Sequence, residues 1–90
     1  MVKPQFEVGR SQVGTGGVVT DPGLRAGAVL GIARRAGELG WRTVAVTASP
    51  LPGPSGNVEY FLRLRAQTDD ALAGAALEAQ VHRAVAEGPQ

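Results

Sequence analysis

A proline- and glycine-rich stretch in the middle of the chain restricts its fold more than any other feature. Residues 49–56 read SPLPGPSG, with three prolines and two glycines in eight positions. Proline fixes φ and removes a backbone donor, so no regular helix or strand can run through this stretch. Strand-like segments flank it: residues 41–48 are rich in β-branched residues, and apolar and polar side chains alternate over residues 57–65. Two strands joined by so short a loop predict an antiparallel pair.

The segment before the first strand predicts a long helix over residues 21–39. Asp21 can accept hydrogen bonds from the first-turn amides, and Pro22 suits the first helical position. Gly40 suits a left-handed C-terminal cap. Apolar side chains at helical spacing predict a stripe that faces the core, made of Leu24, Ala28, Val29, Ile32, Ala36 and Leu39.

A second helix is predicted near the C-terminus. The run Thr68-Asp69-Asp70 offers an N-terminal cap, with acidic groups at the positive end of the helix dipole. His82 lies within this helix and has no Ser or Cys motif nearby, so we expect an exposed histidine without a catalytic role. The helical spacing continues as far as residues 88–89 through Ala73, Leu77, Val81 and Ala84.

The first residues read as the end of a strand, with the rest of that strand expected before Met1. In α/β sheets, reactive groups gather at the edge where the parallel strands end. Lys3 would lie on that edge, and Glu59, near the start of the returning antiparallel strand, would lie on the same edge. We therefore expect the two side chains to come together. Taken alone, each is more typical of a solvated surface charge.

Composition limits the function classes without selecting one. Ninety residues allow one domain or part of one. The absence of cysteine and the single histidine exclude a disulfide framework and a Cys/His zinc site, and no metal site is expected. No apolar run approaches the roughly 20 residues of a membrane span, and no signal peptide is visible, so we expect a soluble cytoplasmic protein. A net charge of +1 permits RNA contact without requiring it.

A glycine-rich run, GTGG at residues 14–17, is a weak candidate for phosphate binding. A P-loop would need a preceding strand and a Gly-Lys-Ser/Thr ending, and a dinucleotide site would need Gly-x-Gly-x-x-Gly at the start of a helix. Neither pattern is present. The run is more typical of a flexible loop on the substrate side of a site.

Three segments carry a family resemblance: VKPQFE at residues 2–7, QVGTGGVV at residues 12–19 and SGNVEYF at residues 55–61. In this order they resemble the C-terminal part of the hemolysin A (TlyA) family of FtsJ-like RNA ribose 2′-O-methyltransferases. The resemblance implies the C-terminal portion of a Rossmann-like class I methyltransferase sheet. Its parts would be the end of a parallel strand, a crossover helix, an antiparallel strand pair and a terminal helix. Residues 1–90 would then lack the S4-like RNA-binding domain and the half that binds S-adenosylmethionine.

The resemblance also implies site residues. The family carries a Lys-Asp-Lys-Glu tetrad, and the motifs matched here place its second lysine at Lys3 and its glutamate at Glu59. Asn57 would lie beside Glu59 at the mouth of the site as a substrate-binding or tetrad-orienting group, and Ser55 would be a further substrate-binding group. The first lysine, the aspartate and the S-adenosylmethionine loop would precede residue 1. The isolated chain is therefore expected neither to bind S-adenosylmethionine nor to methylate its implied substrate, the ribose 2′-hydroxyl of cytidine in ribosomal RNA.

Two other readings of the chain remain open at this point. In the first, the chain is a non-catalytic α/β module that binds RNA or a protein. In the second, an open sheet edge without its neighbours drives self-association. The side chains that would make contacts in the binding module are Arg34, Arg35, Arg63 and Arg65.

Overall fold

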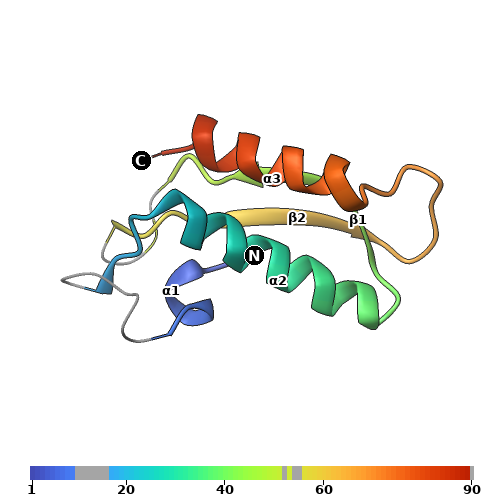
Figure 1. The fold of residues 1–90 in the computed structure, drawn as a ribbon, viewed down its shortest axis with the longest axis horizontal. Helices are drawn as coiled ribbons and strands as arrows, with labels where there is room; N and C mark the ends of the chain where they lie inside the picture. The colour runs from blue at the N-terminus through green and yellow to red at the C-terminus, as the bar shows by residue number, and fades with distance from the viewer. Residues whose placement is uncertain (10–16, 52, 54–55, 90) are drawn as a thin grey trace.

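The described part of the chain forms three helices and two strands. The structure is a computed structural model that describes residues 1–9, 17–51, 53 and 56–89. In chain order the elements are α1 (Pro4–Glu7), α2 (Pro22–Glu38), β1 (Arg42–Ala48), β2 (Tyr60–Arg65) and α3 (Gly74–Glu87) (Figure 1). Helices α2 and α3 contact each other and β1. The α/β prediction is confirmed as a two-stranded antiparallel sheet with helices packed against it.

The two strands pair as the loop between them predicts. Ala48 lies opposite Tyr60 at one end of the pair, and Arg42 lies opposite Arg65 at the other. β2 begins at Tyr60, three residues later than the alternating pattern suggests. The reason is that Asn57 belongs to the loop, where its carbonyl oxygen accepts a 2.8 Å hydrogen bond from the Gly53 amide.

Val2 extends the sheet on the other side of β2. Its amide donates to the Tyr60 carbonyl at 2.6 Å, and the Tyr60 amide donates to the Val2 carbonyl at 3.0 Å, which makes an antiparallel bridge. Because β1 is also antiparallel to β2, the Val2 segment runs parallel to β1. The Val2 segment therefore runs in the direction predicted for the end of a parallel strand. Within the described residues, it pairs with β2 through a single bridge. Helix α2 connects these two parallel segments.

Local signals fix both ends of α2. The Asp21 carboxylate accepts from the Leu24 amide at 3.1 Å, as predicted. At the other end the Trp41 amide donates to the Ala36 carbonyl at 2.9 Å, and Gly40 takes a φ of 90°. This arrangement is a Schellman cap, which needs a residue that tolerates positive φ.

The predicted apolar stripe of α2 is only partly correct. Ala28 and Val29 are buried, but Leu39 is 79% exposed, so its assignment to the core is wrong. Leu39 is the C-cap residue, with φ of −90° and ψ of 5°, and it leaves the helical face that the spacing assumes. The remaining stripe members are half-buried: Leu24, Ile32 and Ala36.

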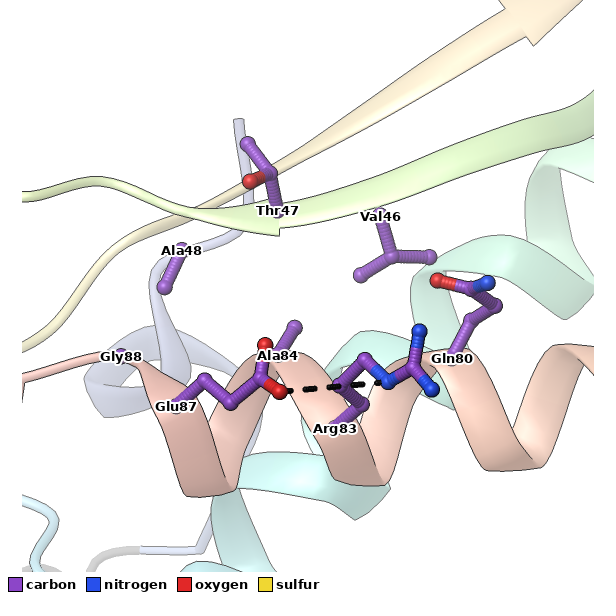
Figure 2. Close-up of a pocket in the computed structure, with 8 residues that line it drawn as sticks. All are labelled: Val46, Thr47, Ala48, Gln80, Arg83, Ala84, Glu87 and Gly88. Carbon is purple, nitrogen blue, oxygen red and sulfur yellow. Dashed lines mark ion pairs between the residues drawn. The ribbon is translucent and has the colours of Figure 1, made fainter.

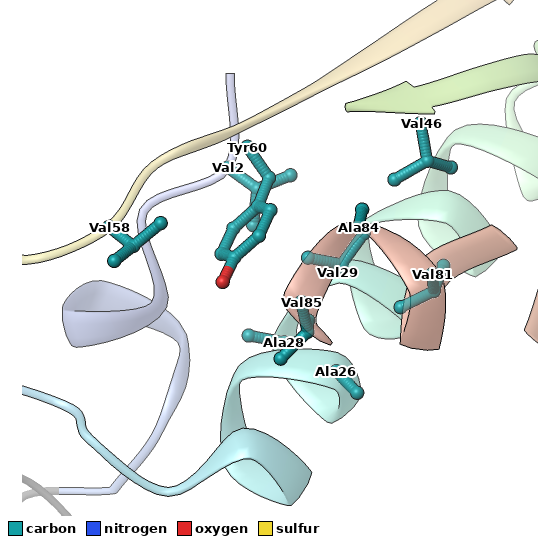
Figure 3. Packing of buried hydrophobic residues seen from close by; sticks show 10 residues of the cluster. All are labelled: Val2, Ala26, Ala28, Val29, Val46, Val58, Tyr60, Val81, Ala84 and Val85. Atoms are coloured by element: carbon teal, nitrogen blue, oxygen red, sulfur yellow. The ribbon is translucent and has the colours of Figure 1, made fainter. Parts of the chain in front are cut away.

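The core lies between the sheet and the two long helices. In Figure 3, Val2, Tyr60 and Val46 extend from the strand side toward Val29 of α2 and Val85 of α3. Tyr60 is fully buried and is the largest of these side chains. Because Tyr60 pairs with Val2 on one side and with Ala48 on the other, burial of this one ring fixes the positions of all three segments.

The predicted start of the last helix is wrong. Thr68 accepts a hydrogen bond from the Asp70 amide at 3.0 Å, but this closes a local turn and not a helix cap. Helix α3 begins at Gly74, and its N-cap Ala73 makes no side-chain cap bond. The intervening residues follow the sheet instead, since the Leu72 amide donates to the Thr43 carbonyl at 2.7 Å.

The described residues contain neither a helix that could span a membrane nor a cluster of side chains that could hold a metal ion. None of their helices combines the length and the apolar character that a bilayer crossing requires. Within the same residues, no group of three or more His, Cys, Asp or Glu side chains comes together.

Candidate functional site

Lys3 and Glu59 meet beside the bridge between Val2 and Tyr60. In an antiparallel bridge the next residues along each segment are again direct neighbours, so Lys3 stands opposite Glu59. The Lys3 Nζ atom lies 3.9 Å from Glu59 Oε2, and the two side chains are 37% and 12% exposed. The prediction that these side chains come together at one edge is confirmed. Backbone register is the cause.

The loop before β2 encloses Glu59. The Glu59 carbonyl oxygen accepts from the Ser49 amide at 2.8 Å, which ties it to the end of β1. Gly53 lies directly against the carboxylate: a Cβ atom at position 53 would stand 2.6 Å from Glu59 Oε2. The sequence identified Gly53 only as a loop former and gave no sign of this contact. The resulting arrangement shelters the carboxylate and leaves the lysine accessible.

Asn57 connects the loop to the segment before α2. Its side chain is buried, with 2% of the residue exposed. The Oδ1 atom accepts from the Val19 amide at 2.9 Å, and Nδ2 donates to the Gly17 carbonyl at 2.7 Å. The predicted substrate-binding amide therefore bonds to the protein's own backbone, two residues from Glu59.

Arg25, on helix α2, supports the segment before that helix. The sequence analysis did not single out this residue. The residue is 2% exposed; its Nε atom donates to the Val19 carbonyl at 3.0 Å and Nη1 to the Pro89 carbonyl at 3.3 Å. Both backbone groups of Val19 are thus bonded to buried side chains. An arginine one turn into a helix normally reads as a surface charge, so no sequence signal marked this contact.

Tyr60 lies fully buried behind the site. Burial raises the pKa of the Tyr60 hydroxyl above its ordinary value of 10.0, and the neighbouring Arg25 guanidinium offsets part of that effect. Within the described residues, the Tyr60 Oη atom has no partner at hydrogen-bonding geometry. The phenol therefore stays neutral beneath the edge that carries Lys3 and Glu59.

The other residues singled out from the sequence are dispersed. Ser55 and residues 14–16 lie outside the described residues, and Gly17 has a φ of 77°. His82 is exposed on α3, as predicted. Arg35 forms an ion pair with Glu7, which joins α2 to α1.

A cavity of about 260 Å³ lies away from the Lys3–Glu59 edge, between β1 and α3 (Figure 2). An ion pair between Arg83 and Glu87, 4.0 Å apart, crosses its α3 side. Neither Lys3 nor Glu59 contributes to its wall. The candidate site is therefore an open edge of the sheet and not this cavity. The remaining lining residues are Val46, Thr47, Ala48, Gln80, Ala84 and Gly88.

Comparison with known proteins identifies the family of this chain. Residues 1–66 match the family described as FtsJ-like methyltransferase. The 16S/23S rRNA (cytidine-2′-O)-methyltransferase TlyA of Mycobacterium tuberculosis is 71% identical over 89 residues, which cover 99% of this chain and 33% of that protein. Hemolysin A of Brachyspira hyodysenteriae is 37% identical over 61 residues, covering 68% of this chain and 25% of that protein.

A solved structure agrees with the sequence matches. The crystal structure of a candidate hemolysin from Lactococcus lactis superposes with a TM-score of 0.75 at 32% identity, over 91% of this chain and 39% of that one. The resemblance identified from three short segments is confirmed. The chain spans about a third or less of the length of the curated relatives cited above.

Proposed function

The chain belongs to the FtsJ-like methyltransferase family, and we propose that it forms the C-terminal part of a catalytic domain that methylates the ribose 2′-hydroxyl of cytidine in ribosomal RNA. The observation that carries this proposal is the Lys3–Glu59 pair, set in place by backbone register at 3.9 Å. The proposed enzyme works in the cytoplasm and is completed by parts that the matched relatives possess beyond this chain. Its sheet would be the edge of a Rossmann-like methyltransferase sheet.

Lys3 is the group that acts on the reacting hydroxyl. Methyl transfer to a ribose oxygen requires the hydroxyl to lose its proton, so a positioned base or a polarising cation must lie against it. Lys3 has the exposure to reach such an oxygen, whereas Glu59 is sheltered. Glu59 accordingly holds the lysine in place and can accept a hydrogen bond from the ribose.

Asn57 acts in this proposal as a positioning residue. Both of its amide atoms bond to the backbone of residues 17 and 19, and its own backbone closes the loop that shelters Glu59. Its contribution is to hold the loop against the segment before α2. Ser55 remains a proposed substrate contact.

The methyl donor is bound elsewhere in the complete enzyme. FtsJ-like methyltransferases generally use S-adenosylmethionine, which supplies the methyl group. The described part of the loop after β1 does not fit it. The loop after β1 is closed on itself by bonds from the Gly53 amide to the Asn57 carbonyl and from the Gly56 amide to the Gly53 carbonyl, so these amides are not free to face a carboxylate or ribose. We assign no donor-binding residue to this chain.

Single-turnover methylation by the complete enzyme, at saturating RNA and donor, tests the proposal. We expect Lys3→Ala to slow transfer by about 10²- to 10⁴-fold, the usual range for loss of a general base, with RNA affinity nearly unchanged. Glu59→Gln should also be severely impaired. Glu78→Gln, an exposed glutamate on α3, is the matched control and should retain full activity. Near-normal transfer by Lys3→Ala would make Lys3 an ordinary surface charge and refute the assignment.

A further inference from the structure

The face of the sheet that points away from the helices carries a row of basic and aromatic side chains. Successive side chains of a strand alternate between the two faces, so Phe61, Arg63 and Arg65 share the face opposite to Tyr60. All three are exposed, and Phe61 has 45% of its surface accessible. Arg42 stands directly opposite Arg65 on β1 and is exposed as well. We call these four residues the sheet-face row.

The positive charge of the sheet-face row is not neutralised by the described residues. Neither strand contains an acidic residue. None of the three arginines forms an ion pair with the part of the chain that the structure describes, whereas Arg35 pairs with Glu7. Like charges directly opposite each other on neighbouring strands are destabilising. An anionic ligand that bridged Arg42 and Arg65 would relieve this repulsion.

The aromatic member of the row is placed for stacking. The residue opposite Phe61 on β1 is Thr47, whose side chain is small, so the ring is not covered from the neighbouring strand. An exposed ring among arginines is the combination by which proteins hold unpaired nucleotides: the ring stacks on a base, and the guanidinium groups bind phosphates. An acidic peptide would use the arginines but gives no reason for the ring.

The sheet-face row starts at the candidate site. Glu59 precedes Phe61 by two residues, and its carbonyl oxygen accepts from the Ser49 amide just after β1, so the pairing of the two strands continues as far as Glu59, beside Lys3. At about 3.3–3.4 Å per residue, Phe61 lies about 7 Å beyond Glu59 and Arg65 about 20 Å beyond it. A strand of nucleic acid whose reacting ribose lies at Lys3 could therefore run directly onto the row.

We propose that single-stranded RNA next to the methylated nucleotide lies along β2, with one base stacked on Phe61 and phosphates bound by Arg63, Arg65 and Arg42. The inference rests on the proposed function and extends it by assigning a surface that positions the substrate. It also requires this neighbouring segment to be unpaired, because a base within a duplex is already stacked and cannot lie on Phe61.

Binding of a fluorescein-labelled single-stranded oligoribonucleotide to the complete enzyme, followed by anisotropy at several salt concentrations, tests the proposal. We expect R63Q/R65Q to lower the magnitude of the slope of log K against log salt by about 1.4, because each phosphate contact in a single strand contributes about 0.7. R63K/R65K keeps the charges and should keep most of the slope. Arg83→Gln is the control: it removes an exposed arginine of α3, which packs on the opposite face of the sheet from the row, and should leave the slope unchanged.

Substitution of Phe61 tests stacking separately from charge. Phe61→Leu should weaken binding about 5- to 150-fold with the salt slope unchanged, and Phe61→Trp should restore it. Thermal unfolding of each variant checks that the fold is retained. A loss of stability in Phe61→Leu without a loss of RNA affinity would mean that another part of the complete enzyme covers the row, and would overturn the proposal. Neither set of variants touches the reacting hydroxyl, so methylation should show a raised KM for RNA with kcat preserved.

The outcomes separate this inference from the proposed function. If the wild-type enzyme methylates RNA while R63Q/R65Q and Phe61→Leu bind as it does, the sheet-face row is not an RNA surface and only this inference fails. If the row variants lose RNA binding but the wild type transfers no methyl group, the surface stands and the proposed function fails. Binding lost equally in R63Q/R65Q and Arg83→Gln would indicate a general charge effect and overturn the proposal.

Discussion

Gly53→Ala should separate activity from stability more sharply than any other single change in this chain. The new Cβ atom would lie 2.6 Å from Glu59 Oε2 and 2.7 Å from Glu59 Cδ. Ordinary van der Waals contact begins at 3.4 Å, so the carboxylate must move by about 0.8 Å, the difference between these two distances. The atoms that must move belong to a flexible side chain, so the loop itself can stay in place.

A displacement of this size is large for catalysis. A misplacement of about 1 Å in a reacting constellation can cost on the order of 10²-fold in rate. We therefore expect single-turnover methylation by the complete enzyme to fall by roughly one to two orders of magnitude. Stability should move the other way, because Gly53 is not among the glycines with positive φ, and alanine restricts the unfolded chain. Where the new side chain fits without strain, such a change typically adds about 0.4–1 kcal/mol to the free energy of unfolding, and displacement of the Glu59 carboxylate offsets part of this gain.

The matched control for Gly53→Ala is Gly37→Ala in helix α2. A Cβ atom at position 37 meets no atom within 4 Å among the described residues, and alanine favours the helix by about 1 kcal/mol over glycine. This variant should gain stability and keep full activity. Both properties are measured on the same preparations by urea unfolding and by single-turnover transfer. If Gly53→Ala keeps wild-type transfer while its fold is intact, the position of the Glu59 carboxylate does not matter for the reaction, and its assigned role is wrong.

Three further predictions concern Asn57, Tyr60 and the binding of S-adenosylmethionine. Asn57→Ala removes two backbone partners and should cost about 1–3 kcal/mol in the free energy of unfolding; Asn57→Asp should also destabilise, because it places an oxygen against the Gly17 carbonyl. Tyr60→Phe should retain or raise stability at pH 7 in urea unfolding. The raised pKa of Tyr60 means that the unfolded chain ionises first above pH 10, so the wild type should lose stability there and Tyr60→Phe should not. Titration calorimetry of the isolated 90-residue chain with S-adenosylmethionine should show no binding, and a micromolar Kd would contradict our placement of the donor site outside the chain.

The sequence predicts those parts of the fold that depend on local chemistry. Asp21 and Gly40 mark the ends of α2 because capping depends on a few neighbouring residues. The start of α3 escapes prediction for the opposite reason: Thr68 has the chemistry of a cap, but the bond from the Leu72 amide to the Thr43 carbonyl holds the following segment along the sheet. The assignment of Leu39 to the core is wrong for a related reason, since helical spacing does not show where a helix stops.

The candidate site likewise has a part that the sequence predicts and a part that it does not. Alternation and chain direction suffice to bring Lys3 and Glu59 to one edge, because they are properties of strands and need no knowledge of packing. The supporting contacts are tertiary. Gly53 reads as a loop glycine and Arg25 as a surface charge until the fold places the first against a carboxylate and the second beneath the segment before α2. Residues that support a site through the packed interior therefore leave little trace in sequence periodicity.

The position of Tyr60 explains why the Lys3–Glu59 pair is precise although Lys3 stands at the start of the described chain. Tyr60 exchanges two backbone bonds with Val2, and its ring is fully buried beneath them. A segment that pairs through a single bridge would ordinarily open easily. Here opening would have to remove Val2, 1% exposed, from the core, and complete burial of a valine is worth about 1.5–3 kcal/mol. Lys3, one residue further on, is thus positioned by hydrophobic burial on the opposite face of the sheet, while its own side chain stays free to reach a substrate.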